Sequence, residues 1–166
     1  MNFSKTFVAA ALFAGVAMAA NAADTAEITL NGEIVLSTCD IELNNGASTL
    51  DVGTYKSQDF VANQQLGSVS LPVSLTNCTD GESGFLKVTG NTASVNNEIF
   101  TQTQDDSVGF MMTYNGTPVV ADQDTAAITV TGTTHDEEFL VGMASETVDP
   151  APGVYSAPIT VAYVVQ

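Results

Sequence analysis

The chain has 166 residues, of which 45% are hydrophobic, so it is long and apolar enough for one domain with a real core and is unlike a disordered chain. Its charge is lopsided, with 19 acidic residues against 3 lysines, which gives a formal net charge of −16. Nucleic acid and anionic membranes are therefore poor partners for this chain.

The first 22 residues have the three parts of a secretory signal peptide. Lys5 supplies the positive n-region, residues 7–18 form an apolar run, and Ala20-Asn21-Ala22 offers a small-residue cleavage site, with Ala17-Met18-Ala19 as a second possible site. The apolar run is too short to be a stable membrane anchor. We expect residues 1–22 to be removed and the mature protein to be exported, beginning at Ala23.

The next segment, residues 23–36, alternates apolar or glycine positions with polar ones, which is the period of a β-strand. The apolar or glycine positions are Ala26, Ile28, Leu30, Gly32, Ile34 and Leu36. On periodicity alone this is either the first strand of a closed fold or a free apolar extension, and a free extension suits strand addition to another molecule.

Cys39 and Cys78 are the two cysteines of the chain. In an oxidising compartment they most simply form one disulfide. A metal site is the weaker alternative, because two cysteines and one histidine, His135, provide too few ligands at a standard spacing.

The rest of the chain predicts short strands separated by turns, and no window has a helical period. Strands are expected near residues 41–43, 50–53, 68–76, 85–89, 108–114, 117–121, 127–131, 138–143 and 159–166. Asn115-Gly116 is a strong hairpin signal, and Pro72 indicates an edge position or a bulge. Residues 54–67 and 90–106 are expected to be mostly loop. Together these features predict an all-β sandwich of seven or eight strands.

The sequence offers little for catalysis. His135 lies in an acidic stretch that we interpret as a solvated loop, and Asp122-Gln123-Asp124 lacks the continuing ligand pattern of a calcium loop. There is no Gly-x-Ser-x-Gly elbow and no glycine-rich phosphate loop. We expect no enzymatic activity, no metal and no cofactor.

Several spaced motifs resemble the chaperone–usher fimbrial subunits, the type 1 pilin-like family. They are residues 31–39, the 39-residue step to Cys78 at the end of residues 73–78, the Leu50-Asp51-Val52-Gly53 segment, and Gly153 as the fourteenth residue from the C-terminal end before an alternating final strand. The resemblance covers residues 23–166. One departure is Val165 as the next-to-last residue, where the family commonly has an aromatic; Tyr163 lies two residues earlier on the same face.

The resemblance implies an incomplete immunoglobulin-like β-sandwich, residues 37–166, that is completed by a donor strand from another subunit. The expected donor segment is residues 23–36, with Ala26, Ile28, Leu30, Gly32, Ile34 and Leu36 as the inserted face. The expected edge of the groove, which also contacts the chaperone, carries Gly153, Ile159, Val161, Tyr163 and Val165.

The resemblance also implies the function and the partners. The chain would be a structural subunit of a bacterial fimbrium at the cell surface, exported through the periplasm, polymerising head to tail with other fimbrial subunits and supporting adhesion. A periplasmic chaperone and an outer-membrane usher would be its partners during assembly. The alternative is a closed, secreted β-sandwich that binds carbohydrate, against which stand the absence of tryptophan and the scattered tyrosines.

Overall fold

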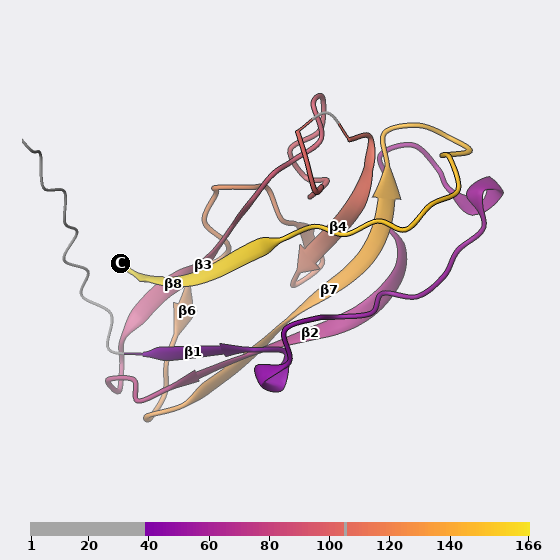
Figure 1. The fold of residues 1–166 in the computed structure, drawn as a ribbon. Coiled ribbons are helices and arrows are strands. Elements are labelled where there is room, and N and C mark those ends of the chain that lie inside the picture. The colour runs from indigo at the N-terminus through magenta and orange to yellow at the C-terminus, as the bar shows by residue number, and fades with distance from the viewer. Residues whose placement is uncertain (1–38, 105) are drawn as a thin grey trace, which may run out of the picture. The chain divides into compact units, whose positions relative to one another are not determined.

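The computed structural model describes residues 39–104 and 106–166, and these form two antiparallel β-sheets packed face to face (Figure 1). The strands are β1 (Asp40–Leu43), β2 (Leu66–Thr76), β3 (Ser83–Gly90), β4 (Val108–Tyr114), β5 (Thr117–Pro118), β6 (Ile128–Thr129), β7 (His135–Ser145) and β8 (Ile159–Val165). Two short 3₁₀ turns, η1 (Asn44–Gly46) and η2 (Ser57–Asp59), complete the described elements. None of the helical segments in these ranges is long and apolar enough to cross a membrane.

One sheet has the strand order β1-β2-β7-β4-β5 and the other has the order β6-β3-β8. All the pairings within both sheets are antiparallel. This is the immunoglobulin-like sandwich that the sequence predicts, with eight strands.

The core lies between the sheets and follows the alternation of the strands. On β2, Val73 and Leu75 are fully buried, and Leu86 and Val88 of β3 face them from the other sheet. Phe100 and Phe139 are the largest fully buried side chains. Burying each large apolar side chain stabilises the fold by about 1.5–3 kcal/mol, so the period of two that predicted the strands also builds the core.

The disulfide forms as predicted, between Cys39 and Cys78, with an S–S distance of 2.10 Å. It joins the residue just before β1 to the residue two positions after β2. The hairpin at Asn115-Gly116 is also confirmed, because both residues have positive φ, 51° and 77°, which is the backbone that a two-residue hairpin turn requires.

Three sequence predictions need correction. Residues 50–53 form no strand, because no other described segment pairs with them. Pro72 lies on β2, which has β1 and β7 as neighbours and so is not an edge strand. Pairing between β1 and β2 reaches only to Val73, so Pro72 lies just past the end of the β1–β2 ladder. His135 belongs to β7 and is not in a loop: its Nε2 lies 2.7 Å from Oε1 of Glu137, and both side chains are mostly buried.

A second small core lies beyond the outer face of the five-stranded sheet, where residues 90–104 cover its end. It consists of Ala93, Ile99, Met111 and Ala144, and it explains why Ile99 is fully buried in a segment without regular structure. Backbone hydrogen bonds between Phe100 and Phe110, at 2.8 and 2.9 Å, hold the loop against β4.

The loop packs closely against β4 at Gly109. A methyl group at this position would overlap the carbonyl oxygen of Phe100, which is backbone and cannot turn aside. We expect Gly109→Ala to destabilise the fold by about 1–3 kcal/mol, measured by urea unfolding, because a tightly packed site has no room for an added group. Ser94→Ala, at an exposed position of the same loop, is the control and should unfold at the wild-type midpoint.

The pKa of Tyr114, at the end of β4, predicts how the stability of the fold changes at alkaline pH. Burial raises the pKa of Tyr114 from 10.0 to about 12, and the carboxylate of Glu137 adds to the rise. The folded chain then keeps a proton that the unfolded chain loses above pH 10, so this contribution to stability is complete below pH 10 and is lost between about pH 10 and 12. The loss of unfolding free energy over that range should be smaller in Tyr114→Phe; an identical loss in both proteins would contradict the assignment.

Candidate strand-accepting groove

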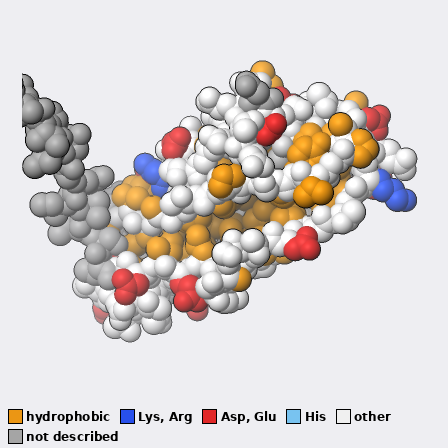
Figure 2. Space-filling view, viewed as in Figure 1, with side chains coloured by type: hydrophobic (Ala, Val, Ile, Leu, Met, Phe, Trp, Pro, Cys, Tyr) orange, Lys and Arg blue, Asp and Glu red, His pale blue; other side chains and the backbone are white. Residues whose placement is uncertain are grey.

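An open groove runs along one side of the sandwich, between the edge strand of each sheet. β1 pairs only with β2, and β8 pairs only with β3, so neither described sheet continues across the gap between β1 and β8. Figure 2 shows apolar side chains forming a band in this gap, flanked by polar surface. An apolar band between two unpaired strand edges is what an immunoglobulin-like sandwich exposes when a strand is missing.

The groove contains two adjoining hollows. The central hollow, about 450 Å³, lies beside β1 and the start of β8 and has Leu71, Met112 and Val141 on its floor. The end hollow, about 490 Å³, lies further from β1 and is lined by Phe60, Val108 and other apolar side chains. The core itself therefore forms the floor of the groove.

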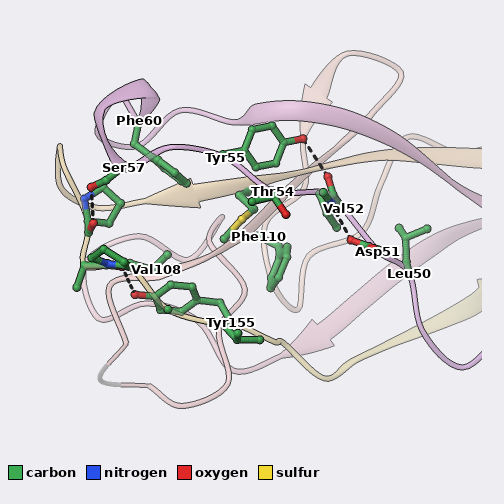
Figure 3. Close-up of a pocket in the computed structure, with 17 residues that line it drawn as sticks. Leu50, Asp51, Val52, Thr54, Tyr55, Ser57, Phe60, Val108, Phe110 and Tyr155 are labelled. Atoms are coloured by element: carbon green, nitrogen blue, oxygen red, sulfur yellow. Dashed lines mark hydrogen bonds between the residues drawn. The ribbon is translucent and has the colours of Figure 1, made fainter.

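Four residues line both hollows and so mark the boundary between them: Leu50, Val52, Phe110 and Tyr155. Figure 3 shows Tyr155 on one side of the end hollow and Val52 on the other, with Phe110 between them.

The first rim of the groove is residues 50–56. Apart from Gly53, whose N–H donates to Oδ1 of Asp51 at 2.9 Å, no backbone N–H in this stretch has a hydrogen-bond partner within the described part of the chain. The failed prediction of a strand at residues 50–53 now has a physical reason: the residues alternate like a strand, with Val52 buried between exposed neighbours, but no strand among the described residues pairs with them.

The second rim is residues 150–158, which continue directly into β8. Tyr155 and Ala157 are half-buried like Ile159, whereas Val154, Ser156 and Pro158 are exposed, so the alternation of β8 extends back into this rim. Among residues 39–104 and 106–166, no backbone hydrogen-bond partner exists for the amides of this rim. Both rims thus contain backbone N–H groups without a hydrogen-bond ladder within the described residues, and unpaired backbone is the feature that strand addition uses.

The structure places the predicted terminal-strand residues in two settings. Val161 and Tyr163 are buried in the core from β8, and Val165 is half-buried on the same face. Ile159 lines the central hollow, and Gly153 lines the end hollow on the second rim. The predicted donor residues, Ala26 to Leu36 in alternation, lie outside the described residues, so their role stays a prediction.

Sequence reasoning missed the residues that shape the groove most, above all Tyr155, Phe110 and Phe60. The signal for Tyr155 was present, because Tyr155, Ala157 and Ile159 continue one alternating row, but the prolines at 150, 152 and 158 favoured a loop. No local signal identifies Phe60, because this buried residue lies in a segment that lacks the period of a strand.

The acidic side chains of the described residues were the other candidates for a site. No group of three or more histidine, cysteine or acidic residues in the described ranges could hold a metal ion. Asp124, from the calcium-like fragment, instead pairs with Nζ of Lys87 at 3.1 Å on the surface.

The described sandwich, open between β1 and β8, defines the chain as having the fold of a pilus subunit. It is similar to the crystal structure of the P pilus rod subunit PapA, with a TM-score of 0.67 and 15% sequence identity, over 78% of this chain and 99% of that chain. It is also similar to a chain in the structure of a chaperone–usher pilus that addresses rod uncoiling, with a TM-score of 0.64 and 16% identity, over 86% and 96% of the two chains. No protein-family model and no curated protein sequence matches the chain.

Proposed function

We propose that this protein is a structural subunit of a chaperone–usher fimbrium, and that it polymerises when residues 23–36 of one copy enter the groove of the next. The observation that carries the proposal is the groove itself, with an apolar floor and unpaired backbone along both rims. The likeness of the fold to pilus subunits, whose titles name a rod subunit and a chaperone–usher pilus, supports the same function.

The donor segment fits the groove in chemistry. Ile28, Leu30 and Ile34 are large and apolar, and burying three such side chains would contribute about 5–9 kcal/mol before any backbone hydrogen bonds are added. Gly32 interrupts the row, and its missing side chain would let the donor backbone lie close to the floor of the groove.

Donation from copy to copy builds a filament. The groove and the donor segment are different surfaces of the same chain, so each contact leaves a free donor at one end and a free groove at the other. The assembled fibre would lie on the cell surface and support adhesion. Before assembly the exposed groove is an aggregation hazard, so a periplasmic chaperone would cover it, with Tyr163 and Val165 at the open edge of β8, and an outer-membrane usher would exchange one occupant for the next.

The test is the behaviour of the purified chain as its concentration rises. Filaments seen by electron microscopy, with scattering that grows with concentration, are the expected result. Monomers at every concentration, together with binding to a glycan array, would contradict the proposal and favour the closed carbohydrate-binding sandwich.

A further inference from the structure

Each rim of the groove contains one tyrosine whose hydroxyl bonds to the backbone of its own rim. On the first rim, the Tyr55 hydroxyl donates to the carbonyl oxygen of Val52 at 2.9 Å. On the second rim, the Tyr155 hydroxyl donates to the carbonyl oxygen of Ala151 at 2.7 Å. The two bonds span three and four residues of chain, so each closes a short loop within its rim (Figure 3).

Each tyrosine ring also rests on a glycine of its own rim. A Cβ built on Gly53 would lie 3.5 Å from the hydroxyl oxygen of Tyr55, and one built on Gly153 would lie 3.4 Å from the ring of Tyr155. Tyr55 also covers Gly67 of β2 so closely that a methyl group there would overlap its hydroxyl. The first rim is thereby fixed to the five-stranded sheet through Tyr55.

The rims need such fixing because they lack the usual source of rigidity. A strand inside a sheet is held by its ladder of backbone hydrogen bonds, and residues 50–56 and 150–158 have no ladder within the described part of the chain. Side-chain bonds to rim residues are few; the others on the second rim are Ser57 Oγ to the Pro150 carbonyl oxygen and Ser156 Oγ to Oε1 of Gln102. Both act near the ends of that rim, and Val154 in its middle is fully exposed.

We propose that Tyr55 and Tyr155 are positioning residues that hold the backbone of the two rims in the conformation seen here, so that an incoming strand meets backbone already in place. This inference rests on the proposed function, because it assigns the two tyrosines to the admission of a donor strand. Ordering a flexible segment during binding costs free energy, and a rim ordered beforehand avoids that cost. The hydroxyl groups should therefore act mainly on the association rate.

The binding test uses the full chain, kept dilute, with an excess of a fluorescent peptide of residues 23–36. Tyr55→Phe and Tyr155→Phe keep the rings and remove only the hydroxyls, and we expect each to slow peptide association by about 3- to 10-fold, as expected for losing one hydrogen bond. Tyr114→Phe is the matched control, since it removes a tyrosine hydroxyl from outside the groove, and it should bind at the wild-type rate. Wild-type association rates in both rim variants would overturn the inference while leaving the proposed function intact.

A second measurement needs no peptide and so separates the two proposals. Limited proteolysis at residues 150–158 should be about 3- to 10-fold faster in Tyr155→Phe than in the wild type, at an unchanged melting temperature, because the free rim is less ordered. If the wild type fails to bind the peptide, the proposed function fails, and this cleavage rate still decides whether Tyr155 orders the rim. Equal cleavage of both proteins would overturn the inference.

Discussion

Replacing Leu30 with Asp is expected to abolish filament formation while leaving the chain folded and exported. Leu30 is the central large residue of the proposed donor segment, and it would be buried in the apolar groove of the next copy. An ionised carboxylate buried there without a partner costs several kcal/mol, which is comparable to the roughly 5–9 kcal/mol that the apolar donor residues supply. Electron microscopy of the purified variant, at a concentration where the wild type forms filaments, measures the effect.

Thr29→Asp is the matched control for this prediction. It adds the same charge to the same segment, one residue away and on the polar face of the alternation, so filaments should still form. Periplasmic levels of both variants should equal that of the wild type, because the substitutions leave residues 39–166 unchanged. Filaments of normal length from Leu30→Asp would refute the proposed donor face.

The second large effect is expected from removing the disulfide. Cys39→Ala together with Cys78→Ala should lower the free energy of unfolding by about 3–4 kcal/mol, since the bridge closes a loop of 39 residues and restricts the unfolded chain. Urea unfolding measures the change, and a reduced wild-type protein should lose a similar amount. An unfolding midpoint equal to that of the oxidised wild type would show that the bridge contributes no stability.

The position of the disulfide also bears on assembly. Cys39 immediately precedes β1, so the bridge fixes this end of the described sandwich to a site near the end of β2. The donor segment that one copy gives to the next would then begin close to a fixed point. We expect the variant with both Cys39→Ala and Cys78→Ala to assemble more slowly than its loss of stability alone would explain. The residue from which the donor segment begins would be less ordered in this variant.

The sequence predicted the parts of the fold that depend on alternation. β2, β3, β4 and β8 were expected within a few residues of their observed ends, because each has one buried face with a clear period of two. The strand expected at residues 138–143 proved longer, since β7 begins at His135. His135 and Glu137 face inward as a hydrogen-bonded pair. Polar residues therefore occupy inward positions of β7, where a strand's alternation normally has apolar ones.

The groove could be predicted only in outline. Alternation identifies residues that can pair with another strand, but it does not say whether that strand comes from the same chain. Residues 50–53 are an example. They have a strand's pattern and form no strand, because pairing is a property of the whole fold. The two hollows, which Leu50 and Tyr155 both line, arise from segments about one hundred residues apart, which no local pattern connects.

We expect the strong negative charge to limit random association between copies of the chain. With 19 acidic residues and 3 lysines, copies repel one another over their general surface. Random association is thereby disfavoured, whereas insertion of an apolar segment into an apolar groove depends little on the net charge. Raising the salt concentration should screen the repulsion and speed assembly, and light scattering at two ionic strengths measures this.

The most direct test of the account is thermal unfolding of a chain that begins at Ser37, measured alone and with a synthetic peptide of residues 23–36. Removing the donor segment leaves the groove and its two unpaired rims with no self-complementary occupant. The account predicts a low melting temperature for the shortened chain alone and a large rise with the peptide, because a ligand that binds only the folded state stabilises it. A shortened chain that is stable by itself and indifferent to the peptide would contradict the account.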